Sequence, residues 1–241
     1  MTERWSALGN VYLVEERHGS EGPTRGLTPD EVRALCSDDA DGVVEVVASE
    51  RDEVDVVIWN RDGSTAELSG NGTRIAARWL ASRTGAERVV VRTGTRRVTA
   101  RMLAADDVET AMGPVEVAPP QLVAGVEVVR VRVGNPHAVV RADPGELEQL
   151  GPLLVDDPAF PEGTNVEVVR VDACGEVTAR VWERGVGETA ASGTGAIAAA
   201  AATHDAGEVT VHFPGGDLLV RLDGGVAILT GPARREADVE R

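Results

Sequence analysis

The sequence is 241 residues long, and its mix of 42% hydrophobic and 27% charged residues is typical of one or two soluble globular domains. Its 24 basic and 40 acidic residues give a formal net charge of -16, which disfavours a nucleic acid or an anionic membrane surface as partner. No stretch reaches the roughly 18 apolar residues of a membrane span, and the first ten residues do not read as a signal peptide. We therefore expect a cytoplasmic protein.

All 24 basic residues are arginine, and this absence of lysine excludes several kinds of chemistry. Without a lysine amine, no side chain can form a Schiff base with pyridoxal phosphate or with a carbonyl substrate. The Walker A phosphate loop, which contains a Gly-Lys pair, is excluded as well. The four histidines, His18, His137, His204 and His212, show no metal-ligand spacing. We expect neither a cofactor nor a metal.

The two cysteines, Cys36 and Cys174, lie far apart in the sequence and form no CxxC pair. This spacing favours two buried free thiols, and one disulfide is the alternative.

Hydrophobic periodicity predicts a chain rich in short strands with few helices between them. In chain order, we expect a helix at 29–35, a strand at 55–59, a helix at 72–83, strands at 88–92, 97–102 and 126–133, a helix at 144–150, strands at 165–171 and 176–181, a helix at 194–203, and strands at 208–212, 217–221 and 227–230.

An internal repeat organises the chain. Ser69-Gly70-Asn71-Gly72 and Ser192-Gly193-Thr194-Gly195 share the pattern Ser-Gly-x-Gly, and each precedes a predicted helix of small residues. Each copy also follows a strand and a polar loop of similar length. The repeat predicts two related lobes, 1–118 and 119–241, with the C-terminal segment able to pack back on the first lobe.

The repeated element suits the binding of an anion. Its glycines allow tight backbone turns, and the start of a helix presents unpaired N–H groups and a partial positive charge. Such a site holds a carboxylate or a phosphate. Two facing copies would hold one carboxylate with a reactive group on each side, which is the geometry that a two-base racemase requires. A single copy, read alone, is more often a plain turn from strand to helix.

Five longer motifs surround these elements. In order they are Asn60-Arg61-Asp62-Gly63-Ser64, Glu67-Leu68-Ser69-Gly70-Asn71-Gly72-Thr73-Arg74, Gly134-Asn135-Pro136-His137, Glu183-Arg184-Gly185-Val186-Gly187-Glu188-Thr189 and Ala191-Ser192-Gly193-Thr194-Gly195. Together they resemble the motifs of the cofactor-independent diaminopimelate epimerases, in the same order and spacing from Leu8 to Ala233.

The resemblance implies an α+β fold of two pseudo-symmetric lobes, each a curved mixed sheet around a central helix, with the substrate in the cleft between them. It also implies a homodimer. Around the substrate it places Asn10, Asn60, Asn135, Asn165 and Arg184. It makes Gly70, Asn71, Gly193 and Thr194 the helix-start donors to the reacting carboxylate, and it adds His137 and Glu183 as supporting polar groups of the catalytic set.

The residue types agree with these roles but do not require them. An arginine such as Arg184 suits a two-point contact with a second carboxylate, although a surface ion pair is an equal reading. Asparagines recognise both ammonium and carboxylate groups. Read alone, Asn165 is better explained as a turn residue and His137 as a hydrogen-bonded strand histidine.

The main departure from the family is that Ser69 and Ser192 stand where it has two catalytic cysteines. A thiol titrates near 8.5, whereas a serine hydroxyl needs a neighbouring base. A helix dipole contributes about 1 kcal/mol, which is too little to make up the difference. Three explanations stay open: deliberate exchange to trap substrate, a slow natural relative that uses His137 or Glu183 through water, or a binding-only paralogue. A smaller departure is Asn10-Val11-Tyr12, where the family usually has Asn-Asp-Phe.

The leading hypothesis is an isomerase that interconverts LL- and meso-2,6-diaminopimelate by two-base proton transfer in lysine and peptidoglycan biosynthesis, with weakened turnover. The alternatives are a racemase or dehydratase of proline or hydroxyproline and a catalytically weak diaminopimelate-binding paralogue.

Overall fold

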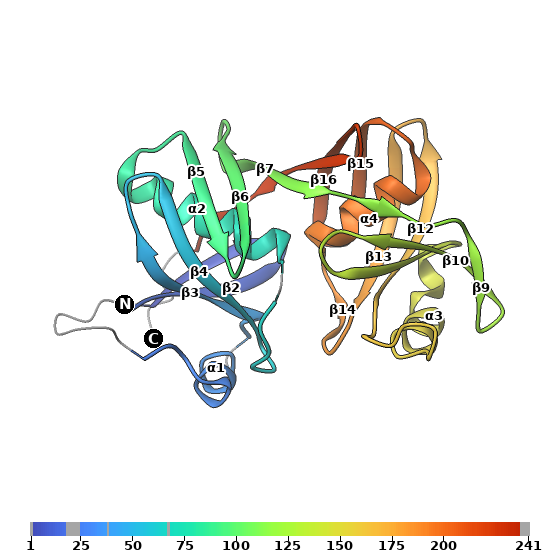
Figure 1. Ribbon diagram of the computed structural model, residues 1–241, viewed down its shortest axis with the longest axis horizontal. Coiled ribbons are helices and arrows are strands. Elements are labelled where there is room, and N and C mark those ends of the chain that lie inside the picture. The colour runs from blue at the N-terminus through green and yellow to red at the C-terminus, as the bar shows by residue number, and fades with distance from the viewer. Residues whose placement is uncertain (1, 18–24, 38, 67, 237–241) are drawn as a thin grey trace. The chain divides into compact units, whose positions relative to one another are not determined.

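The computed structural model describes residues 2–17, 25–37, 39–66 and 68–236 (Figure 1). Glu67 of the second motif and His18 lie outside these residues. The chain forms two compact units. Unit 1 comprises Met1–Thr110 with Gly231–Arg241, and unit 2 comprises Ala111–Thr230.

Unit 1 is built on an ordered ladder of strands. They are β1 (Thr2–Ala7), β2 (Asn10–Glu16), β3 (Gly42–Ser49), β4 (Glu53–Asn60), β5 (Arg88–Thr93), β6 (Arg96–Met102), β7 (Asp107–Pro114, which continues into unit 2) and β18 (Arg234–Arg235). Pairing is antiparallel in β1–β2, β3–β4 and β5–β6, and parallel in β2–β3 and β4–β5. Parallel neighbours need a crossover, and helices supply both of them.

The two helices of unit 1 begin at strong sequence signals. In α1 (Pro29–Leu35), Thr28 and Glu31 form a capping box before a proline in the first turn. The 15-residue α2 (Gly70–Thr84) begins after Ser69 and ends at Gly85, whose φ of 73° suits glycine. Most of α2 is buried, and its Ile75, Trp79 and Leu80 belong to the core formed with the strand valines.

Unit 2 repeats this plan. Its strands are β8 (Glu116–Val117), β9 (Gln121–Val123), β10 (Val126–Arg132), β11 (Pro136–Arg141), β12 (Asn165–Ala173), β13 (Glu176–Glu183), β14 (Gly187–Thr189), β15 (Gly207–Phe213), β16 (Gly216–Asp223) and β17 (Val226–Pro232, which continues into unit 1). Pairing is antiparallel in β10–β11, β12–β13 and β15–β16, and parallel in β11–β12 and β13–β15.

Helices again cross between the parallel strands of unit 2. A 3-10 turn (Pro144–Glu146) leads into α3 (Leu147–Leu154), whose Leu147, Leu150 and Leu154 share a core with residues of β11 and β12. The 11-residue α4 (Gly193–Thr203) consists almost wholly of alanine and other small residues. Residues 196–200 of α4 are fully buried, as expected of a helix that is apolar on every side. Figure 1 shows α4 among the strands of unit 2.

The register confirms that the two units share one topology. Tyr12 on β2 pairs with Gly42 on β3, and His137 on β11 pairs with Asn165 on β12. One residue further along β3 and β12, Val43 pairs with Trp59 on β4 and Val166 pairs with Trp182 on β13, so these pairs correspond as well. Each tryptophan precedes the serine of its Ser-Gly-x-Gly motif by the same number of residues. The expected mixed α+β fold with a repeated sheet and helix is therefore present.

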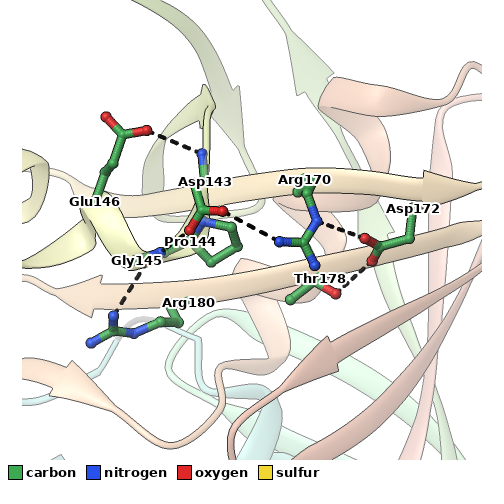
Figure 2. Close-up of polar contacts among 8 residues, drawn as sticks. All are labelled: Asp143, Pro144, Gly145, Glu146, Arg170, Asp172, Thr178 and Arg180. Carbon is green, nitrogen blue, oxygen red and sulfur yellow. Dashed lines mark hydrogen bonds and ion pairs between the residues drawn. The ribbon is translucent and has the colours of Figure 1, made fainter.

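A polar network stabilises the exposed end of the β12–β13 hairpin. Figure 2 shows Arg170 between two carboxylates, with Nε donating to Asp172 at 2.7 Å and Nη1 donating to Asp143 at 3.4 Å. The Thr178 hydroxyl also donates to Asp172, and this bond together with Arg170 lowers the pKa of that carboxyl. None of the eight residues drawn in Figure 2 belongs to the predicted site.

The cysteines correct one expectation. Both thiols are free, and Cys36 is buried as expected. Burial raises its thiol pKa. Cys174 is exposed, however, because it lies in the turn between β12 and β13.

None of the helices in the described part of the chain has the length and apolar character of a membrane span.

Candidate active site

Ser69 forms the cap at the start of α2. Its backbone is extended, with φ −127° and ψ 118°, and its Oγ accepts a hydrogen bond from the Gly72 N–H at 3.0 Å. Gly72 must be small, because a Cβ there would lie 2.9 Å from the Ile58 side chain. The first turn of the helix is therefore seated tightly on β4. Its remaining N–H groups carry the partial positive charge that favours an anion.

Tyr12, which the sequence analysis did not assign to the site, reaches Ser69. Its Oη lies 3.4 Å from Ser69 Oγ, within hydrogen-bond range, and either hydroxyl can donate. The tyrosine ring is buried and packs over Gly42, where a Cβ would come within 2.7 Å of the ring. The available signal was the departure at Asn10-Val11-Tyr12, but the contact depends on how β2 meets α2.

The side chain of Asn71, the second residue of α2, forms a hydrogen bond within its own helix. Its Oδ1 accepts from Nη2 of Arg74 at 2.7 Å, and Arg74 is wholly buried. Burial lowers the pKa of the Arg74 guanidinium to about 10, against the opposing attraction of Tyr12 and Asp107. Nη1 of Arg74 has no hydrogen-bond partner among the described residues. The predicted role of Asn71 as a donor therefore rests on its backbone N–H.

Two further asparagines of unit 1 lie at strand ends. Asn10, at the start of β2, is buried and donates to the Ala7 carbonyl at 3.4 Å. Asn60, at the end of β4, donates to the Ser64 hydroxyl at 2.9 Å. Asn60 and Tyr12 both pair with Gly42, so the three residues form one row across β2, β3 and β4.

Ser192 repeats the cap at the start of α4 in unit 2. Its Oγ accepts from the Gly195 N–H at 3.2 Å, and the residue is only 3% exposed. A Cβ on Gly195 would lie 2.8 Å from Oε1 of Glu167, so the carboxylate sits directly against the start of the helix. Among the hydrogen bonds of the described residues, none joins Ser192 Oγ to an ionisable side chain.

A buried network runs from Glu167 to the start of α4. The Glu167 carboxylate lies 2.7 Å from Nδ1 of His137, and both side chains are fully buried. Nε2 of His137 lies 3.0 Å from Oδ1 of Asn135, whose Nδ2 lies 3.4 Å from the Thr194 hydroxyl. Both ring nitrogens of His137 therefore face a side-chain oxygen, Oε1 of Glu167 on one side and Oδ1 of Asn135 on the other. Sequence analysis missed Glu167, which reads as one residue in a run of strand valines.

Asn165 and Arg184 form a third group in unit 2. Oδ1 of Asn165 accepts from the backbone N–H of Arg184 at 2.9 Å. The Arg184 side chain is exposed, packs over Gly163 and donates from Nη1 to the Glu162 carbonyl. Its remaining guanidinium N–H groups keep the geometry needed to grip a carboxylate. Glu183 precedes it as the last residue of β13 and is half-buried.

The structure thus gathers Ser69, Gly70 and Asn71 around one helix start in unit 1, with Tyr12 added. In unit 2 it gathers Ser192, Gly193 and Thr194 around the other, with Asn135 and His137 joined to them through hydrogen bonds. These two helix starts can each bind an anion, and each presents a serine hydroxyl beside it.

The chain matches known proteins over most of its length. The family model described as diaminopimelate epimerase matches residues 6–118 and 129–236. A diaminopimelate epimerase from Synechococcus sp. is 37% identical, with 95% of this chain and 94% of the relative covered. One from Thermobifida fusca is 42% identical, with coverage of 72% and 68%.

Solved structures share the fold at low identity. A predicted epimerase from Pseudomonas aeruginosa gives a TM-score of 0.76 at 14% identity, covering 98% of this chain and 96% of the other. A hydroxyproline epimerase from Agrobacterium vitis gives 0.72 at 16% identity, covering 98% and 90%. The sequence matches, unlike these structural ones, are strong enough to decide the family, and the chain belongs to the diaminopimelate epimerase family.

Proposed function

We propose that this protein is an isomerase that binds 2,6-diaminopimelate and interconverts its LL and meso forms slowly. The observation that carries the proposal is the twin helix start, in which Ser69 and Ser192 cap α2 and α4 in the same way within a chain of this family. We assign the two serines to the positions from which the α-proton is removed and returned.

The helix starts supply the electrostatic part of the reaction. Removal of the α-proton leaves negative charge that spreads onto the α-carboxylate. Backbone N–H groups at Gly70, Asn71, Gly193 and Thr194 are fixed before the reaction, so they stabilise that charge without reorganising. The reaction thereby needs no electron-sink aldehyde, in keeping with a sequence that has no lysine.

Substrate selectivity is assigned to Arg184 and Asn165. Diaminopimelate carries an amino-acid group at each end, and the group that does not react offers a carboxylate to an exposed guanidinium. Proline and hydroxyproline have no second amino-acid group, so this pair favours diaminopimelate over them.

The supporting roles differ from those that the sequence alone suggested. His137 is fully buried and paired with Glu167. We therefore assign it to holding Asn135 and the start of α4 in place rather than to proton transfer through water. Family membership also leads us to propose a cytoplasmic homodimer. Analytical ultracentrifugation measures the mass of the assembly.

Calorimetry tests the substrate. We expect diaminopimelate to bind and proline and hydroxyproline to bind at least about tenfold more weakly, equivalent to about 1.4 kcal/mol. Arg184→Gln should remove most of this preference, and Arg221→Gln, at an exposed position of β16, serves as the matched control. Tighter binding of proline than of diaminopimelate would support the alternative racemase instead.

A further inference from the structure

The two serines differ in one respect that bears on the proposed reaction. Ser69 has a phenol beside it, because Tyr12 Oη lies 3.4 Å from Ser69 Oγ. The Ser192 hydroxyl has the Gly195 N–H as its only hydrogen-bond partner among the described residues. The two halves are therefore unequal in their capacity to move a proton.

Tyr12 occupies the register position of His137 in the other unit. Tyr12 pairs with Gly42, as His137 pairs with Asn165. The residue that corresponds to Glu167, two positions after Gly42, is the buried Val44. Unit 1 thus has the apolar Val44 where unit 2 has the carboxylate that contacts the His137 imidazole. The Tyr12 phenol, which takes the place of that imidazole, does not require a carboxylate partner.

A buried positive charge interacts with the Tyr12 phenol. Arg74, the fifth residue of α2, is wholly buried, and its guanidinium has an electrostatic interaction with Tyr12. A buried positive charge is screened less than one in water, so its attraction for a nearby anion is larger. A free phenol titrates near 10, much closer to neutrality than an aliphatic hydroxyl.

From these contacts we infer that Tyr12 is the proton-relay partner of Ser69, an assignment that rests on the proposed function. The Ser69 hydroxyl oxygen accepts a hydrogen bond from the Gly72 N–H with one lone pair. Its other lone pair can accept a proton while the hydroxyl donates its own. It is the bridge between the substrate and the phenol.

The proposed step is balanced in atoms and charge. The Cα–H bond of the substrate breaks and an Oγ–H bond forms at Ser69, while the original O–H bond of Ser69 breaks and an O–H bond forms at the Tyr12 oxygen. The electron pair of the broken C–H bond stays on the substrate. Negative charge therefore passes from the phenolate to the substrate carbanion, and the reverse step returns the proton.

The inequality of the two serines has a measurable consequence. A relay on one side only exchanges the α-proton with solvent and returns it to the same face. Exchange of the α-proton for deuterium should therefore run faster than inversion of the centre.

The test is α-deuteration of diaminopimelate in heavy water, followed by proton NMR, with inversion followed by chiral chromatography. Tyr12→Phe keeps the ring and removes the oxygen, and we expect it to slow exchange at least about tenfold. In the Ser69→Cys plus Ser192→Cys form the thiolate is itself the base, so the same substitution should slow exchange less than about threefold. Thermal unfolding of each variant confirms that it is folded.

A double-mutant cycle locates the effect. Tyr12→Phe and Ser69→Ala should be strongly non-additive, because each breaks the same relay. Tyr12→Phe and Ser192→Ala, the matched pair, should combine additively.

The possible results separate the two claims. The relay is overturned if Tyr12→Phe leaves the exchange rate of the serine form unchanged, or if it slows exchange by the same factor in the serine and cysteine forms. It is also overturned if the serine form binds diaminopimelate but does not exchange its α-proton, while the cysteine form does. If neither form binds or exchanges diaminopimelate, the proposed function itself fails, and the relay fails with it.

Discussion

At the scale of single residues, Gly42 determines whether Tyr12 can take its position. A Cβ at residue 42 would lie 2.3 Å from the Trp59 carbonyl oxygen and 2.7 Å from the Tyr12 ring, so both strand neighbours would have to move. We expect Gly42→Ala to lower the free energy of unfolding by about 3 kcal/mol, as overpacking of a tight core does.

Chemical denaturation measures this loss. Gly26→Ala is the matched control, because the added carbon would make only an ordinary contact of 3.4 Å with Glu45. Equal stability of the two variants would contradict the tight packing of Tyr12.

The sequence predicted some of the site residues and not others, for a physical reason. The serine caps follow from local patterns, since Ser-Gly-x-Gly before a helix acts within four residues. The Tyr12–Ser69 and His137–Glu167 contacts join residues 57 and 30 positions apart. They depend on which strands pair and on how a helix packs against them, and no local sequence pattern predicts either.

At the scale of secondary-structure elements, the helices could be predicted better than the central strands. Thr28-Pro29, Ser69 and Ser192 mark helix starts by their own chemistry. By contrast, β3 has five consecutive buried residues and β11 has four, so neither shows the alternation of a half-exposed strand. Both are paired in parallel with a neighbour, and strands covered on both faces read as continuous apolar runs.

His212 links three strands in a way that depends on pH. It lies on β15, with Nδ1 2.8 Å from Asp217 on β16 and Nε2 beside Glu176 on β13. These two carboxylates, Asp217 first, raise the pKa of the imidazole above its usual value. A raised pKa in the folded state means that the contribution to stability is fully present below about 6.5 and is lost as the pH rises through the folded value.

We therefore expect His212→Gln to destabilise the protein at pH 5.5 and to have little effect at pH 9. The ring is 37% exposed and solvent screens the pair, so the loss should stay below about 1 kcal/mol. Thermal unfolding at the two pH values measures it, with His204→Gln as the comparison histidine. A loss of the same size at both values would contradict an ionic role for His212.

At the scale of the whole molecule, the same topology occurs in both units, but the side chains around the two serine caps differ. Both units keep the ladder of strands, the crossover helices and the serine cap. They differ in what supports the cap: Tyr12 and a buried arginine in unit 1, and a buried carboxylate and imidazole in unit 2. The repeated motif reveals the shared plan, whereas the differences emerge only from the side-chain contacts.

As proposed, the molecule retains the binding groups of a diaminopimelate epimerase and is slow because oxygen has replaced sulfur at two positions. The most direct measurement is the rate at which LL-diaminopimelate becomes the meso form, compared between this chain and its Ser69→Cys plus Ser192→Cys variant. We predict that the variant is faster by at least about a hundredfold, the lower end of what a positioned acid–base group contributes. A folded variant that binds diaminopimelate but inverts it no faster than the serine form would contradict the account.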